Sequence, residues 1–256
     1  MKDFNLLEAI KKADAGDLDA MFEVASYLVY GDQSETLEPE IAERAVNYYQ
    51  ICADNGDTYA MLDLGGMYID GRGVKKDREK ALEWYQKAVE LGEPIAYRCL
   101  GNFYRYDTLE DSKVVLTDDL DRIKKAHEYF VAGSELDNEN CLYELGDMFM
   151  EGLIENKDAS KAFELYERAY DIILDQKDYN PGYINDCESD VTYRLAKCYH
   201  YGLGVDKDIK EAWEYIKTAF TEVKRRSEEG DMFGASFFEE IENEYILIFR
   251  EIEEGN

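Results

Sequence analysis

The sequence predicts an all-α fold, a right-handed superhelical solenoid of about five helix-turn-helix repeats with a capping helix at each end. The first observation is a block that begins with Ala60-Met-Leu-Asp-Leu-Gly65. It returns at Ala96–Gly101 and Cys141–Gly146, and more loosely at Ala20–Ala25 and Val191–Ala196. The second is a block that follows each of these copies, at Arg44–Cys52, Lys80–Ala88, Lys125–Gly133, Lys161–Ala169 and Glu211–Ala219. A repeat of this period indicates stacked units that bury their apolar faces against one another.

Each block has the spacing of a helix. In the second block an alanine is followed at plus four by Tyr49, Tyr85, Phe130, Tyr166 or Ile216, and at plus seven by Cys52, Ala88, Gly133, Ala169 or Ala219. Offsets of four and seven place these residues on one helical face. Small residues at fixed places indicate crossings at which two helices approach closely. Each repeat is therefore predicted to be a helix A, a turn and a helix B.

The turns are also visible in the sequence. Gly71-Arg-Gly73-Val74 and Gly202-Leu-Gly204-Val205 join the two blocks, and their first glycine can end helix A in the left-handed conformation. Asp77, Asp158 and Asp208 stand where a carboxylate caps the start of helix B. The third repeat departs from this pattern. Its connection, Asp107 to Asp121, is predicted to be a mobile insertion, outside the packing stripes of its two helices.

Apolar stripes at the two ends predict the caps that a solenoid requires. Phe4, Leu6, Leu7 and Ile10 predict an N-terminal amphipathic helix. Residues 231–252 predict a C-terminal capping helix whose stripe contains Phe237, Ile241, Tyr245, Ile248 and Ile252. The alternative is that this second stripe docks a helix of a partner.

At these residues the chain resembles the Sel-1-like repeat (SLR) family, a subclass of tetratricopeptide-like α-solenoids. The long Gly-x-Gly-Val turn and the missing proline after helix B favour this family over the ordinary tetratricopeptide repeat. We predict a single domain over residues 1–256, with repeats at about 17–55, 56–91, 92–136, 137–177 and 188–226. The resemblance implies an interaction scaffold or adaptor that binds a partner protein or peptide on the concave surface of the A helices.

The composition limits the kinds of partner that the protein can bind. The 58 acidic and 29 basic residues give a formal net charge of −29, which disfavours binding to nucleic-acid phosphates and to anionic membranes. The same charge suggests an alternative function, an acidic immunity-type or inhibitor protein that neutralises a basic effector. The oligomeric state stays open. The chain shows no signal peptide, and it lacks the paired cysteines of secreted family members, so we expect a cytoplasmic protein.

No catalytic constellation is visible, so we expect neither enzymatic activity nor a cofactor or metal. A hydrolase is the third and weakest alternative. His127 and His200 lie in different repeats without a Cys or His at metal-ligand spacing, and both are predicted to be surface or groove residues.

Positions of helix A that the packing stripe does not use are the candidate partner-binding residues. They are Tyr30, Arg98, Asn102, Arg105, Tyr143, Asp147, Tyr193, Arg194, Lys197, His200 and Tyr201. Two interpretations remain open. The basic members could hold a carboxylate of a bound peptide. Alternatively, they could form an internal ladder that joins Arg98 to Glu144, Glu144 to Arg194 and Asp147 to Lys197.

Overall fold

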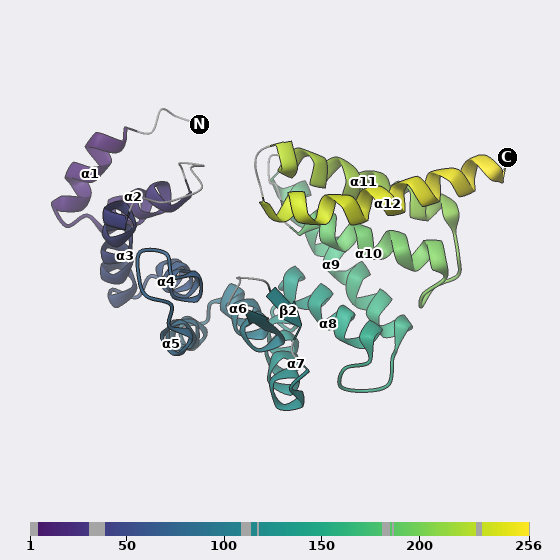
Figure 1. Ribbon diagram of the computed structural model, residues 1–256, viewed down its shortest axis with the longest axis horizontal. Helices are drawn as coiled ribbons and strands as arrows, with labels where there is room; N and C mark the ends of the chain where they lie inside the picture. Colours follow the sequence, from purple (N-terminus) through teal and green to yellow (C-terminus); the bar gives the residue numbers. More distant parts are fainter. Residues whose placement is uncertain are drawn as a thin grey trace. The chain divides into compact units, whose positions relative to one another are not determined.

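A computed structural model describes residues 5–30, 39–108, 114–116, 118–180, 185, 187–228 and 232–255. The chain divides into two compact units, Met1–Phe103 and Tyr104–Asn256. Each unit is built from antiparallel helix pairs (Figure 1). The predicted all-α repeat architecture is confirmed. The single domain over 1–256 stays a prediction.

The first unit holds the first two repeats and the helix A of the third. Its helices are α1 (Leu6–Asp14), α2 (Leu18–Tyr30), α3 (Pro39–Asp54), α4 (Thr58–Asp70), α5 (Arg78–Glu90) and all but the end of α6 (Pro94–Arg105). The N-terminal cap is confirmed as α1. Leu6 and Ile10 of the predicted stripe pack against the core beside the buried Ala9 and Ala13, whereas Leu7 is 65% exposed; Phe4 lies outside the described residues.

The second unit completes the third repeat and carries the fourth and fifth. Its helices are α7 (Leu120–Ser134), α8 (Glu139–Glu151), α9 (Ala159–Tyr179), α10 (Glu188–Tyr201), α11 (Ile209–Glu228) and α12 (Met232–Glu254). Helix α12 lies along α11 (Figure 1) and buries Ile241 and Ile248 in a cluster with Ile216 and Val223 of α11. The predicted C-terminal capping helix is therefore confirmed.

The connection of the third repeat contains a short hairpin that the sequence did not predict. Strand β1 (Tyr106–Thr108) pairs antiparallel with β2 (Val114–Leu116), with Tyr106 opposite Leu116. The predicted mobile insertion, Asp107 to Asp121, thus contains paired strand residues and the start of α7. Valine and leucine suit a strand, and strand pairing satisfies backbone groups that a loop would leave to water. Residues 109–113 and 117 lie outside the described part of the chain.

The turns between helix A and helix B follow the prediction. Gly71, Gly152 and Gly202 end their helices with φ between 68° and 75°. The second glycine of two turns has a further role, because a Cβ on Gly73 would lie 2.6 Å from the carbonyl oxygen of Ala42, and one on Gly204 2.1 Å from that of Ala159. Only glycine lets the turn approach the helix B of the preceding repeat so closely.

The predicted caps of helix B are in place. Asp77 and Asp158 each accept a hydrogen bond at 3.0 Å from the backbone N–H three residues further on, and Asp208 accepts one at 2.9 Å from Lys210. None of the described helices is both long and apolar enough to cross a membrane.

Glycine also permits the crossing of helix A over helix B. A Cβ on Gly65 would lie 2.2 Å from the ring of Tyr85, and one on Gly146 would lie 2.5 Å from the ring of Tyr166. The small residues of the repeat thus leave room for an aromatic ring of the partner helix.

We therefore expect Gly65→Ala to lower the free energy of unfolding by about 1–3 kcal/mol, because the added methyl group would force Tyr85 out of its place. Gly66→Ala is the matched control, since a Cβ there meets nothing within 4 Å. The control should be neutral or raise the stability by up to about 1 kcal/mol through helix propensity. Equal urea midpoints for the two variants would contradict a steric role for Gly65.

Candidate functional site

A tyrosine recurs at the end of helix A or directly after it in the first, third and fifth repeats. Tyr30, Tyr106 and Tyr201 each stand ten residues after the residue that opens the first block. Their hydroxyls donate to a carboxylate on a following helix, Asp63 of α4 at 2.9 Å, Glu144 of α8 at 3.1 Å and Glu244 of α12 at 3.1 Å. Tyr30 and Tyr201 remain 53% and 50% exposed. These bonds hold two large rings in place at the surface.

A buried ladder of charges runs between the A helices of the second unit. The guanidinium of Arg105 lies 3.5 Å from Glu144 and 3.0 Å from Glu151. Arg194 binds both oxygens of Asp147, at 2.7 and 2.6 Å, and Asp147 also accepts the hydroxyl of Tyr166 at 2.6 Å. The paired geometry of a guanidinium on a carboxylate is among the strongest polar contacts in proteins.

The expected internal ladder therefore exists, but with different partners. Glu144 pairs with Arg105, and the predicted contact between Asp147 and Lys197 is wrong because Arg194 occupies Asp147. The ammonium of Lys197 instead lies 5.2 Å from the centroid of the Tyr193 ring. Sequence spacing identified the correct helices, but it does not fix which long side chain reaches which carboxylate.

Glu144 and Asp147 of α8 differ in their electrostatics. Burial raises the pKa of Glu144 to about 7, although the nearby Arg105 guanidinium opposes the shift. Burial also acts on Asp147, but the charge and hydrogen bonds of Arg194 outweigh it, and the pKa of Asp147 is lowered. A carboxyl that exchanges its proton near neutrality therefore lies beside one that stays ionised.

The predicted partner-binding residues differ widely in exposure. Tyr30 and Tyr201 are exposed, whereas Tyr193, His200 and Arg105 are buried, the last only 3% exposed. The others are half-buried: Arg98, Asn102, Tyr143, Asp147, Arg194 and Lys197. Only the first two thus offer a large surface to a partner.

The placement of His200 on the surface or in a groove is wrong, because the residue is 5% exposed. Its Nδ1 lies 2.6 Å from Glu244 and its Nε2 3.0 Å from Glu251, both on α12. These acids are seven residues apart, so they share the face of α12 that meets α10. The seven-residue spacing of Glu244 and Glu251 can be read from the sequence, but the sequence does not show that α12 packs against α10.

We find no group of three His, Cys, Asp or Glu residues that could hold a metal ion within the described ranges. All five cysteines fall in those ranges, and no disulfide joins any of them.

Paired helices and the glycine crossings within the pairs define the chain as an α-solenoid repeat protein. The model of the Sel1 repeat family matches residues 18–57, 58–93, 140–171 and 189–220, which is more than half of the chain. The chain belongs to the Sel1 repeat family. Proteins with this repeat generally mediate protein–protein interactions, typically as a non-catalytic scaffold.

Relatives with known names match only short stretches. The chain is 43% identical over 53 residues to the ERAD-associated E3 ubiquitin-protein ligase component HRD3A of Arabidopsis thaliana, which is 20% of this chain and 8% of that protein. It is 30% identical over 82 residues to DAP3-binding cell death enhancer 1 of Rattus norvegicus, which is 32% of this chain and 16% of that protein. The chain thus spans less than a fifth of either relative.

Solved structures share the fold along most of the chain. A protective antigen of uropathogenic Escherichia coli, c5321, superposes with a TM-score of 0.62 at 24% identity, over 97% of this chain and 48% of that one. A Sel1 repeat protein of Oxalobacter formigenes gives 0.60 at 22% identity, over 92% and 59%. The immunity protein Pa5087 of Pseudomonas aeruginosa gives 0.52 at 20% identity, over 88% and 82%.

The raised pKa of Glu144 predicts a pH dependence of stability. The unfolded carboxyl, with an ordinary pKa of 4.5, loses its proton before the folded one, whose pKa is about 7. The folded state therefore binds more protons between these values, so this group makes stability fall as pH rises. Glu144→Gln should remove that contribution, and its stability relative to the parent should increase from pH 5 to pH 8. If the free energies of unfolding of the parent and of Glu144→Gln changed with pH in the same way, a raised pKa of Glu144 would be contradicted.

Arg194→Ala should lower the free energy of unfolding by about 3 kcal/mol, because it leaves Asp147 largely buried without its partner. Lys12→Ala is the control, since Lys12 pairs with Glu8 at the exposed surface of α1 and should cost at most about 1 kcal/mol. Both can be measured by denaturant unfolding. Equal losses would show that the ladder contributes no more than a surface pair.

Proposed function

We propose that this protein is a non-catalytic scaffold that binds a partner protein through the helix A surface, defined here, for each unit by itself, as the outward positions of α2 and α4 in the first unit and of α8 and α10 in the second. The exposed Tyr30 and Tyr201 carry the proposal. A tyrosine offers a large contact area and a polar tip at a small cost in conformational entropy. Their carboxylate partners reduce that cost further by orienting the rings before binding.

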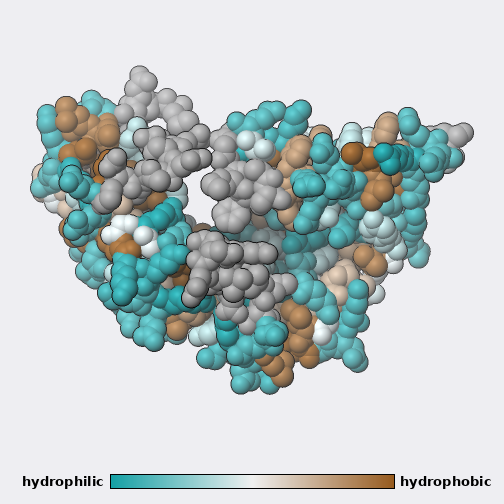
Figure 2. Space-filling model, viewed as in Figure 1, coloured by the Kyte–Doolittle hydropathy of each residue, from teal (hydrophilic) through white to brown (hydrophobic). Residues whose placement is uncertain are grey.

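The internal ladder favours a basic partner over an acidic peptide. Arg105 is buried, and Arg194 already binds both oxygens of Asp147, so an incoming carboxylate would have to displace an existing pair. Hydrophilic side chains cover much of the face of each unit seen in Figure 2, and the chain carries a net charge of −29. A field of this sign accelerates the association of cationic partners.

A second candidate function is an immunity-type or inhibitor protein that neutralises a basic effector. The net charge supports it, and a solved structure with the same fold is an immunity protein of Pseudomonas aeruginosa. We also propose a cytoplasmic location, because five cysteines without a disulfide suit a reducing compartment.

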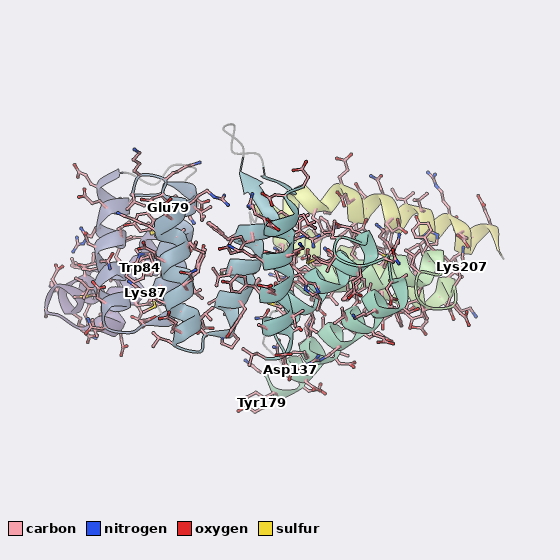
Figure 3. The ribbon with its side chains drawn as sticks, turned by 90° about the horizontal axis from the view of Figure 1, so that it is seen from below. Glu79, Trp84, Lys87, Asp137, Tyr179 and Lys207 are labelled. Carbon is pink, nitrogen blue, oxygen red and sulfur yellow. The ribbon has the colours of Figure 1, made fainter. Side chains whose placement is uncertain are left out.

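The test is affinity capture from the native cell, followed by binding measurements with the captured partner. Tyr30→Ala and Tyr201→Ala should each weaken binding about tenfold or more, as expected for aromatic anchors. Tyr179→Ala is the matched control, since Tyr179 is 94% exposed on α9 and points away from the protein in Figure 3. Association should slow steeply as salt is added. Unchanged affinity in both helix A variants would refute the use of this surface.

A further inference from the structure

A cation precedes the buried alanine of helix B in four of the five repeats. The residues at this place are Arg44, Lys80, Lys125, Lys161 and, in the fifth repeat, Glu211. The three lysines each lie over the aromatic ring that stands eight residues after the residue that opens the first block. Lys80 is 5.1 Å from the centroid of Tyr68, Lys125 is 5.0 Å from Tyr104 and Lys161 is 3.8 Å from Phe149. An ammonium is attracted to the negative face of such a ring.

The fifth repeat keeps the ring and loses the cation. Tyr199 occupies the equivalent position in helix A, and Glu211 replaces the lysine. Within the described ranges, no lysine or arginine lies over the Tyr199 ring, although such contacts occur elsewhere, as between Lys87 and Trp84 at 3.8 Å (Figure 3).

The third repeat shows that the ring can still accept an ammonium. Tyr104 stacks on Tyr129 with centroids 5.7 Å apart and planes at 7°, while Lys125 lies over Tyr104. Tyr199 stacks on Tyr215 with the same separation and planes at 9°. The stacked pair therefore has the same geometry in both repeats, and in the third repeat it leaves room for the cation.

Tyr199 also meets the ring of Phe163, with centroids 5.4 Å apart and planes at 88°. Such a contact does not exclude a cation, because Phe149 meets His127 with planes at 80° and still has Lys161 over its ring.

The charges of nearby carboxylates act on the Tyr199 ring. The pKa of Tyr199 is raised by burial and then by the charges of Glu167 and Glu211. Both glutamates are exposed, and neither forms an ion pair with any residue that the structure describes. Asp208 is also near, but it caps the first turn of α11. Negative charge thus converges on a ring whose counterparts each hold an ammonium.

We propose that Tyr199, together with Glu211 and Glu167, binds a lysine side chain of the partner protein, which supplies the ammonium that the second, third and fourth repeats carry internally. The proposal rests on the proposed function in one respect, that the ligand belongs to a protein. It adds a second contact area, on the side of the fifth repeat where α9, α10 and α11 meet. A single contact of this kind is weak, so it would select basic partners rather than hold them alone.

The test is an NMR titration of the full chain with a synthetic peptide that contains one lysine between glycines. The control peptide has norleucine, which keeps the length of the side chain and removes its charge. The backbone amide signals of Tyr199 and Glu211 should shift saturably with the lysine peptide, in the millimolar range, and should not move with the control. No saturable shift, or equal shifts along the exposed acids of α9, would overturn the proposal.

Two charge-reversal variants test the proposal further. Glu211→Lys should place a lysine of the chain itself over the Tyr199 ring, so the peptide should no longer shift the Tyr199 signal. Lys125→Glu should vacate the Tyr104 ring and create a second site, so that new shifts appear at Tyr104. Circular dichroism confirms that both variants fold. Binding that persists in Glu211→Lys, or no new site in Lys125→Glu, would count against the proposal. Either failure would leave the helix A surface standing, because Tyr30 and Tyr201 test it separately.

Discussion

The close crossing of helix A over helix B at a glycine is the constraint on which the rest of the structure depends. At Gly146 the ring of Tyr166 fills the space that any Cβ would take. This contact fixes the rotation of α8, and the hydroxyl of the same tyrosine reaches Asp147 one residue further on. Asp147 in turn holds Arg194 of α10. A packing requirement within one repeat thus positions the charged contact to the next repeat.

The scarcity of cations gives the basic residues a structural role. In a chain with twice as many acids as bases, Arg105 and Arg194 are used between A helices, and three lysines of the B helices cover rings of the A helices. The acids left over face solvent and produce the negative field. Within the part of the chain that the structure describes, no lysine lies over the Tyr199 ring, so in our proposal a lysine of another molecule makes the contact that Lys80, Lys125 and Lys161 make in their repeats.

The two candidate surfaces differ in how they would act. On the helix A surface, Tyr30 and Tyr201 are held by carboxylates and offer broad area, which suits affinity. Around Tyr199, one ring and two carboxylates offer a single charged contact. Such a contact contributes more to specificity for a basic partner than to affinity. A scaffold that uses both would recognise a basic protein by shape at one place and by charge at the other.

The sequence by itself determined the repeats, the turn glycines, the aspartate caps and the terminal helices, because these follow from local spacing and from the backbone freedom of single residues. It also placed Arg105, Arg194 and Asp147 on neighbouring A helices. Only the tertiary structure decided that Arg194 binds Asp147, that His200 is buried by Glu244 and Glu251, and that Val114–Leu116 pairs as a strand. These contacts depend on the rotation and register of separate elements and on the reach of long side chains, which no local pattern encodes.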